Sequence, residues 1–228
     1  MNNIQESIEA AIQTLANCFL ENPYMFFTEA DAVAHFHKLL NEFLSFDRML
    51  QTKDNYHTEL IHQEYPTFFR FEKKNPKARL GPPAKRGHYD IAVLNQKFVT
   101  SHDAKVVLNR TINTTRDEEI KPLDAVIEFK LDNVGWSSGK AQGAKADLDK
   151  LHLSSEASLR YFVVLMRYMS PKSYRWETYW HGIRKKAKQI SDVKSIFVTK
   201  WVGNKCGDAS YQFNGWLNSE LIEKDSTA

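Results

Sequence analysis

Six consecutive apolar residues, Tyr161 to Met166, constrain the fold of this sequence more than any other stretch. An unbroken apolar run is typical of a strand covered on both faces, because a half-solvated strand alternates apolar and polar residues. Leu123 to Leu131 and Ser195 to Val202 also predict strands. A sheet covered on both faces needs a layer of helices on each side, so the sequence predicts an α/β fold.

Helical periodicity supplies candidates for those layers. Apolar residues recur at helical spacing from Ile4 to Leu20, and Thr28 is a candidate N-cap for a second helix that ends near Leu44. Residues 140–153 and 174–190 predict two later helices. The order of elements favours a three-layer αβα sandwich with a central mixed sheet and an N-terminal helical addition.

The stretches between these elements give three further expectations. Short strands at 60–65 and 68–71 flank Pro66 and suggest a hairpin, and strand character returns at His88 to Leu94. Residues 72–87 are rich in proline, glycine and basic side chains, which predicts an exposed loop. Residues 95–122 show no sustained period and are interpreted as an insertion.

Length and composition predict one structural domain, with residues 1–58 as a helical region packed on a core of residues 59–228. Hydrophobic residues make up 42% of the chain, yet no run is long enough to span a membrane and no secretion signal is visible. Cys18 and Cys206 lack metal-ligand spacing, so we expect reduced thiols and a cytoplasmic protein.

Charge is distributed unevenly along the chain. Residues 1–69 contain 3 Lys and Arg against 10 Asp and Glu, whereas the remainder contains 28 against 18. The first part is therefore net −7 and the rest net +10. A basic surface of this kind can bind a phosphate backbone, because lysine and arginine gain affinity by releasing condensed counterions.

Three charged residues lie inside apolar strands: Asp90 in one, and Glu128 and Lys130 in another. Alternate residues of a strand share a face, so Glu128 and Lys130 point the same way. Burying unpaired charge costs several kcal/mol, which makes a functional role more plausible than chance. Two carboxylates can hold Mg²⁺, which polarises a phosphoryl oxygen and lowers the pKa of an attacking water. Lys130 can orient or deprotonate that water and offset charge in the transition state.

Asp90 and the Glu128-Phe129-Lys130 triplet resemble the PD-(D/E)XK nuclease superfamily, which has the restriction-endonuclease-like fold, over roughly residues 59–202. Tyr89 stands where the motif has proline. The resemblance implies a divalent-metal-dependent nuclease with Asp90, Glu128 and Lys130 as catalytic residues, and DNA as a more frequent substrate than RNA. Asp90, Glu128 and the carbonyl of Phe129 would bind Mg²⁺, for which Mn²⁺ would substitute.

The resemblance also implies further residues at the site. Relatives often add an acid from a preceding element, for which Glu64 is the first choice, Glu59 the second and Glu42 the third. The helix after the triplet often presents a polar residue to the site, and Gln142 and Lys145 are the candidates here.

Two basic stretches are candidates for contacts with a nucleic-acid backbone. Residues 70–86 contain seven Lys and Arg against one acid, and residues 172–205 contain nine against two, although a solvated helix face explains the second stretch equally well. The candidate contact residues are Lys85, Arg86, Lys140, Lys145, Arg184, Lys185 and Lys186.

Other functions remain open at this point. A catalytically silent nucleic-acid-binding or scaffold protein on the same fold is the main alternative, and a hydrolase of another phosphate substrate is a weaker one. The sequence also leaves open whether the protein acts as a homodimer or with a partner subunit. Residues 135–140 depart from the phosphate-binding loop pattern, because the spacing between the glycines is one residue short and Ala141 replaces the Ser or Thr of the pattern. No zinc or serine-hydrolase motif is present.

Overall fold

The structure is a computed structural model that describes residues 4–44, 49–72, 75–79, 86–109, 121–132, 138–168 and 174–201. Its helices, in chain order, are α1 (Ile4–Glu21), α2 (Glu29–Phe43), α3 (Gln96–Ser101), α4 (Ala104–Asn109), α5 (Ser138–Leu153) and α6 (Tyr174–Gln189). Its strands are β1 (Met49–Gln51), β2 (His57–Glu59), β3 (Ile61–Glu72), β4 (Asn75–Arg79), β5 (Arg86–Leu94), β6 (Leu123–Asp132), β7 (Ala157–Tyr168) and β8 (Lys194–Trp201).

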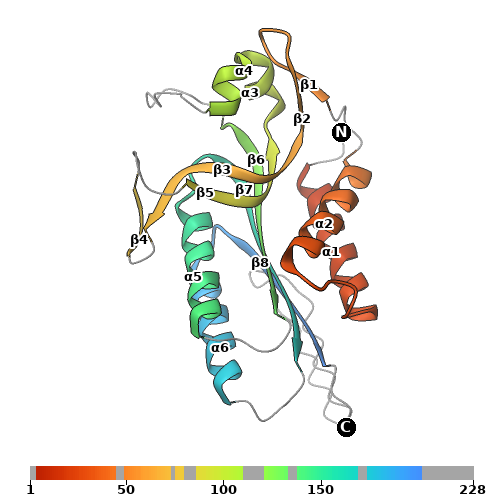
Figure 1. Ribbon diagram of the computed structural model, residues 1–228, viewed down its shortest axis with the longest axis vertical. Coiled ribbons are helices and arrows are strands. Elements are labelled where there is room, and N and C mark those ends of the chain that lie inside the picture. Colours follow the sequence, from red (N-terminus) through yellow and green to blue (C-terminus); the bar gives the residue numbers. More distant parts are fainter. Residues whose placement is uncertain are drawn as a thin grey trace.

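Six strands form a mixed sheet in the order β4-β3-β5-β6-β7-β8, and β1 and β2 form a separate hairpin (Figure 1). The pairs β3/β4, β3/β5 and β5/β6 are antiparallel, whereas β6, β7 and β8 are parallel. A mixed central sheet was predicted, and β6 is the strand at which the two pairing modes meet. The two strands that carry the predicted acids, β5 and β6, are therefore adjacent.

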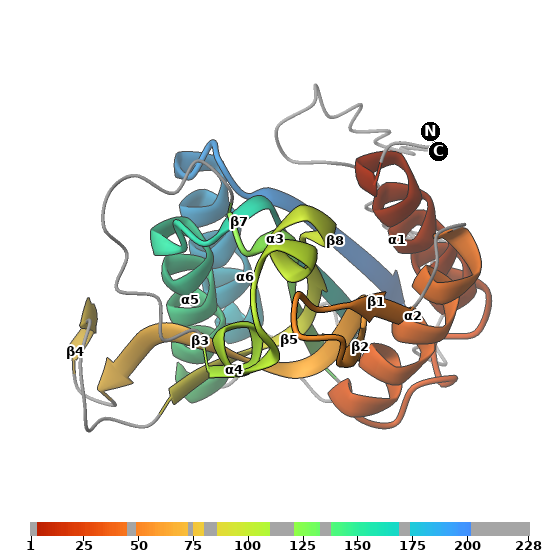
Figure 2. The ribbon, with the colours of Figure 1, turned by 90° about the horizontal axis from the view of Figure 1, so that it is seen from above.

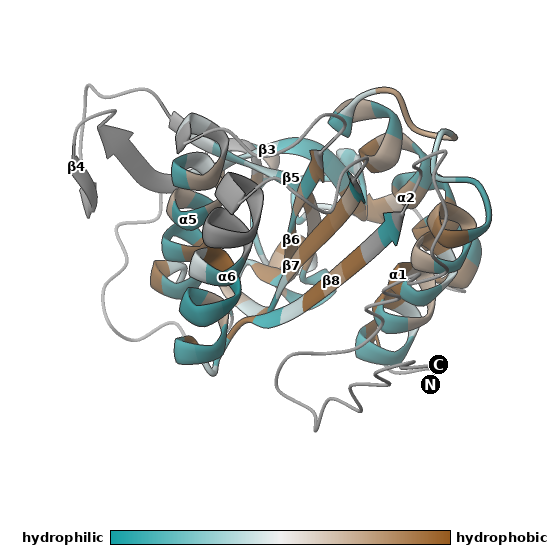
Figure 3. Ribbon diagram, turned by 90° about the horizontal axis from the view of Figure 1, so that it is seen from below, coloured by the Kyte–Doolittle hydropathy of each residue, from teal (hydrophilic) through white to brown (hydrophobic). Residues whose placement is uncertain are grey.

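Helices cover both faces of this sheet. α1 and α2 pack together and contact the sheet on one face, whereas α5 contacts β6 and β7 on the other face and α6 packs against α5 (Figure 2). The parallel strands run as apolar ribbons between the two helical layers (Figure 3). The three-layer αβα arrangement predicted from the sequence is therefore present, and the N-terminal helices form one of its layers.

Burial explains why the β7 run contains no polar residue. All six residues from Tyr161 to Met166 are buried, and β7 pairs with β6 on one side and β8 on the other. A strand covered by helices on both faces and by strands on both edges has no solvated position for a polar side chain.

The predicted hairpin around Pro66 is wrong. Residues 61–72 form the single strand β3, which pairs antiparallel with β4. Pro66 is tolerated inside β3 because β4 pairs only with Arg70 and Glu72, so the described strands leave the opposite edge of Pro66 outside any ladder. The register of β3 against β5 also shifts between Pro66 and Arg70.

Two other stretches contain more regular structure than predicted. Strand β4 lies within the predicted loop 72–87, and α3 and α4 lie within the predicted insertion 95–122. Both helices are only six residues long, too short to produce a clear helical period in the sequence. The predicted helical region 1–58 also contains β1 and most of β2. None of the described helices is both long and apolar enough to cross a membrane.

Candidate metal and charge site

Asp90 lies where β5 and β6 stop pairing. The last residue pair at this end of the ladder is Ile91 with Ile127, so Asp90 and Glu128 are the next residues along the two strands. Beyond that pair, the Oδ2 atom of Asp90 accepts a hydrogen bond of 2.6 Å from the backbone N–H of Phe129. The Asp90 side chain thus accepts from a backbone N–H where the β5–β6 ladder has ended. This hydrogen bond holds the Asp90 carboxyl group beside the Glu128-Phe129-Lys130 triplet.

Glu128 is almost fully buried, with 1% of its surface exposed. Its Oε1 forms a 2.5 Å ion pair with the Nζ of Lys150 on α5, which is its only ion pair among the described residues. Lys150 is also buried and donates a 2.7 Å hydrogen bond to the carbonyl of His88. A carboxylate buried this deeply is costly to ionise, and Lys150 only partly offsets that cost.

Lys130 connects both helical layers to the sheet. Its Nζ lies 3.0 Å from Glu29 of α2 and 3.0 Å from Asp147 of α5. Asp147 in turn lies 3.1 Å from Lys150. We call the six residues Glu29, Asp90, Glu128, Lys130, Asp147 and Lys150 the charged cluster.

The start of α2 is fixed by its own sequence. Thr28 caps the helix by accepting from the backbone N–H of Asp31, and the Asp31 carboxylate accepts from the backbone N–H of Thr28. Glu29, the next residue after the cap, accepts a 3.2 Å hydrogen bond from the backbone N–H of Leu131. The capping box therefore holds Glu29 in place at the end of the triplet.

The neighbouring residues of β6 explain why the charges gather on one side. Ile127 and Phe129 are buried, and the ring of Phe129 packs 5.1 Å from the ring of Phe36 on α2. The predicted alternation of packed and charged residues along this strand is therefore present: apolar side chains face α2, while Glu128 contacts α5.

Burial raises the pKa of both strand carboxyl groups. For Asp90 it raises the pKa to about 6, although Lys130 and the N–H of Phe129 act in the opposite direction. Burial raises the pKa of Glu128 well above its ordinary value, and Lys150 only partly offsets it. Both groups therefore resist ionisation unless positive charge is close by.

The lysines and Asp147 shift toward their charged forms. Burial alone would lower the pKa of Lys130, but Asp147 and Glu29 outweigh it and raise the pKa above its ordinary value. Glu128 and Asp147 raise the pKa of Lys150 in the same way, again against burial. The pKa of Asp147 is lowered, because Lys150 and Lys130 outweigh its burial. Both lysines are therefore ammonium groups at neutral pH.

The charge balance of the cluster fits a divalent cation. Its four carboxyl groups and two ammonium groups sum to −2 when all are ionised. Among the described residues, no three acidic, histidine or cysteine side chains converge into a metal cage. Mg²⁺ does not need one, because one or two carboxylates and several waters suffice. Asp90 and Glu128 stay the predicted carboxylate ligands, and the carbonyl of Phe129 stays a predicted third ligand.

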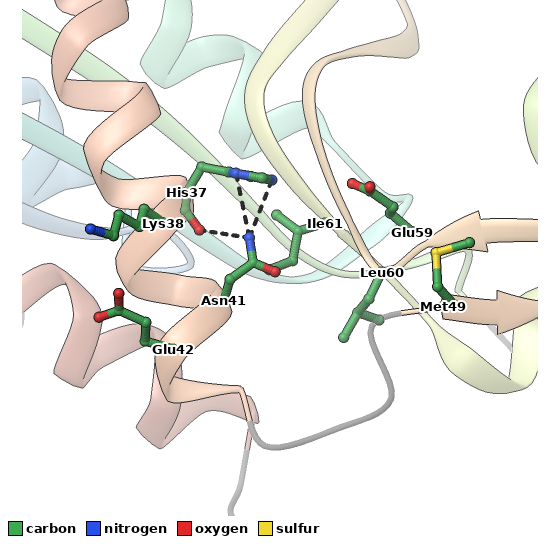
Figure 4. A pocket seen from close by; sticks show the side chains of 8 residues that line it. All are labelled: His37, Lys38, Asn41, Glu42, Met49, Glu59, Leu60 and Ile61. Carbon is green, nitrogen blue, oxygen red and sulfur yellow. Dashed lines mark hydrogen bonds between the residues drawn. The ribbon is translucent and has the colours of Figure 1, made fainter.

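The predicted additional acids do not join the cluster. Glu64 is exposed on β3 with a left-handed backbone (φ 50°), and none of the described contacts links it to Lys130. Glu59 and Glu42 instead line a cavity of about 630 Å³ between α2 and the β1–β2 hairpin (Figure 4). We call it the α2–hairpin cavity; its other lining residues are His37, Lys38, Asn41, Met49, Leu60 and Ile61.

On α5, Gln142 is exposed, and a Cβ atom added at Gly182 of α6 would lie 3.2 Å from the Nζ of Lys145. Lys145 therefore packs against α6, and the polar groups that α5 presents to the strands are Asp147 and Lys150. The expectation that this helix contributes polar side chains was sound, but the residues chosen were different ones.

The residues predicted to contact a nucleic-acid backbone differ in their exposure and in their partners. Lys185 is exposed on α6, Lys186 pairs with Asp149, and Arg184 is buried and offers little surface to a nucleic acid. Lys85 lies outside the described residues, as do the side chains of Arg86 and Lys140.

Comparisons of the chain with protein-family models, curated proteins and solved structures gave no match.

Proposed function

We propose that this protein is a divalent-metal-dependent nuclease of the PD-(D/E)XK kind that hydrolyses phosphodiester bonds, with DNA favoured over RNA. One observation carries the proposal: Asp90 and Glu128 come together from adjacent strands beside Lys130. The resemblance implies such an arrangement, and 37 residues separate Asp90 from Glu128 in the sequence.

Asp90 and Glu128 are the residues that would hold Mg²⁺ or Mn²⁺. When bound, the metal polarises the phosphoryl oxygen and lowers the pKa of a water. Burial raises the pKa of both Glu128 and Asp90, so a cation bound beside them would stabilise their ionised forms.

Lys130 serves as a fixed positive charge. Its raised pKa disfavours a role as general base, because the ammonium group would not release its proton at neutral pH. A preorganised ammonium group instead stabilises the charge that develops on the phosphoryl oxygens in the transition state.

The remaining members of the cluster are positioning residues. Glu29 and Asp147 hold the ammonium group of Lys130 from opposite helical layers. Lys150 holds the carboxylates of Glu128 and Asp147. Such supporting contacts set the orientation of the groups that touch the substrate.

The alternative is a catalytically silent nucleic-acid-binding or scaffold protein. One observation favours it: in the charged cluster both lysines already contact carboxylates, so the charges are partly compensated without a metal.

Cleavage assays separate these proposals. Plasmid, linear and single-stranded DNA and RNA would be incubated with the wild type and with Glu128→Ala, in Mg²⁺, Mn²⁺ or EDTA. We expect cleavage by the wild type only with metal and none by the variant. Salt-sensitive binding without cleavage of any substrate would instead support the silent protein.

A further inference from the structure

The loop between α1 and α2, residues 22–28, exposes three large apolar side chains within four residues. Phe27 is 75% exposed, Tyr24 is 52% exposed and Met25 is 40% exposed. Apolar residues scattered singly over a surface need no explanation, but a cluster of this kind is typical of a binding site.

This α1–α2 loop is held in place rather than loosely attached. Phe26 is buried and its ring lies 5.4 Å from the ring of His35. The backbone N–H of Phe27 donates to the carboxylate of Asp31, which also belongs to the capping box of α2. The backbone that carries the exposed rings is therefore preorganised, so binding there costs little ordering entropy.

The loop is also directly connected to the charged cluster. Glu29, which contacts Lys130, follows Phe27 by two residues, and two residues of chain span at most about 7 Å. The guanidinium group of Arg167 on β7 lies 5.2 Å from the centre of the Tyr24 ring. Arg167 is buried and packs against the Tyr24 ring, so what the loop offers beside the candidate phosphodiester site is exposed aromatic surface.

We infer that the α1–α2 loop binds an unpaired nucleobase of the substrate, with Phe27 and Tyr24 as the stacking residues. Aromatic rings stack on any exposed base, whereas the bases of an intact duplex are already stacked on each other. If a phosphate group of a nucleic-acid strand lies at Lys130, the neighbouring nucleotides of that strand lie at the α1–α2 loop. The preferred substrate is therefore single-stranded, or a duplex with an unpaired or frayed end near the cut.

This inference rests on the proposed function for its location but can be tested without cleavage. The full-length wild type, Phe27→Ala and Tyr24→Ala would be titrated in EDTA with a labelled single-stranded oligonucleotide and with a closed hairpin duplex. A second oligonucleotide with 2-aminopurine would report base stacking as quenched fluorescence. Tyr56→Ala is the matched control, because Tyr56 is a 65% exposed aromatic on the β1–β2 hairpin, beyond the far end of α2 (Figure 1).

We expect Phe27→Ala to weaken single-strand binding by roughly 5- to 100-fold, the range measured for the loss of one base–aromatic stack. The 2-aminopurine quenching should fall, hairpin binding should change less than about twofold, and Phe27→Tyr should restore the wild-type affinity. Unchanged single-strand affinity in both alanine variants would overturn the inference, as would an equal loss in Tyr56→Ala. So would a dimer of the wild type that Phe27→Ala dissociates, because the loop would then be covered by a second copy of the chain.

Failure here is distinguishable from failure of the proposed function. If the wild type cleaves in a metal-dependent way and Phe27→Ala and Tyr24→Ala bind the single strand as the wild type does, the base-stacking role of the loop is wrong and the nuclease proposal stands. If single-strand binding depends on Phe27 but the protein cleaves no substrate, the base-stacking role stands and the nuclease proposal is wrong.

Discussion

The two ends of α2 each carry a glutamate into a group of polar side chains, and the two groups differ in burial. At the N-terminal end, Glu29 joins the charged cluster, in which Glu128 and Lys150 are buried. At the C-terminal end, Glu42 lines the α2–hairpin cavity together with the exposed Glu59 (Figure 4).

The difference shows that an evident cavity is a weaker sign of chemistry than buried charge. Water solvates the exposed carboxylates of the cavity at little cost, so their presence needs no function. In the charged cluster, burial disfavours the ionised forms of Asp90 and Glu128, and carboxyl groups perturbed in this way are typical of functional sites. The predictions below test this contrast.

The largest expected effect is on Glu128. We expect Glu128→Gln to reduce the cleavage rate at saturating Mg²⁺ by at least about 1,000-fold, because it removes a metal-binding charge without changing the shape of the side chain. Glu59→Gln in the α2–hairpin cavity should stay within about twofold of the wild type. Single-turnover rates with a labelled oligonucleotide would measure both. Equal losses of cleavage rate in Glu128→Gln and Glu59→Gln would mean that the charged cluster and the α2–hairpin cavity do not differ in catalytic importance.

The lysines should separate by role. Lys130→Met is expected to lower the rate about 100- to 1,000-fold, because it removes the cation that stabilises the transition state. Lys150→Met should lower it about 10- to 100-fold, the range typical of residues that orient the groups in contact with a metal or substrate. The Mg²⁺ concentration for half-maximal rate should change more in Lys150→Met than in Lys130→Met, because Lys150 forms a direct ion pair with the predicted ligand Glu128. A larger loss of cleavage rate in Lys150→Met than in Lys130→Met would mean that Lys150 stabilises the transition state and Lys130 is the positioning residue.

Glu29 and Glu42 form a matched pair on one helix. Glu29→Gln should reduce cleavage about tenfold, since it removes one of the two carboxylates that hold Lys130. Glu42→Gln should leave the rate unchanged. Both rates would be measured under identical conditions, and an unaffected Glu29→Gln would mean that Asp147 alone positions Lys130.

The smallest expected effect is a gain in stability. Burial raises the pKa of Asp90 to about 6 from an ordinary 3.8, so the folded state favours the protonated form. Protonation of Asp90 therefore contributes to the free energy of unfolding below pH 3.8, and this contribution is lost as the pH rises through 6. Asp90→Asn should therefore be about 1 to 3 kcal/mol more stable than the wild type at pH 7.5 in EDTA.

Thermal unfolding at two pH values checks that sign. A gain of 1 kcal/mol corresponds to about 2 to 4 °C in Tm for a chain of this size, and the advantage of Asp90→Asn should shrink toward pH 4.5. Mg²⁺ should raise the Tm of the wild type more than that of the variant. A variant less stable than the wild type at both pH values would mean that the carboxylate stabilises the fold.

The main elements of the fold could be predicted because their sequences leave few options. The β7 run has no polar residue to place on a solvated face, and Thr28 and Asp31 have the spacing of a capping box. Pro66 was misread because a proline that ends a strand and one that lies in a strand with an open edge have the same local sequence.

The candidate site could be predicted only in part, for a similar reason. Asp90, Glu128 and Lys130 stand out because each is a charge inside an apolar strand. Glu29 lies in the first turn of a helix, where an acid is common because it stabilises the helix dipole, so its sequence context carries no functional signal.

The residues of α5 were missed because their partners are distant in sequence. Asp147 and Lys150 are three residues apart, a spacing typical of an ordinary surface ion pair on a helix. Only the packing of α5 on β6 shows that these two side chains contact Glu128 and Lys130. Contacts between elements that are far apart in the chain are not encoded in the local pattern.

The central claim is that Asp90, Glu128 and Lys130 form one metal-dependent cleavage site. Its most direct test is the rate of oligonucleotide cleavage by the wild type and by Asp90→Ala across a Mg²⁺ titration, with circular dichroism to verify that both are folded. The account predicts saturable, Mg²⁺-dependent cleavage by the wild type and none by the folded variant. Cleavage by Asp90→Ala at the wild-type rate, or by the wild type in EDTA, would contradict it.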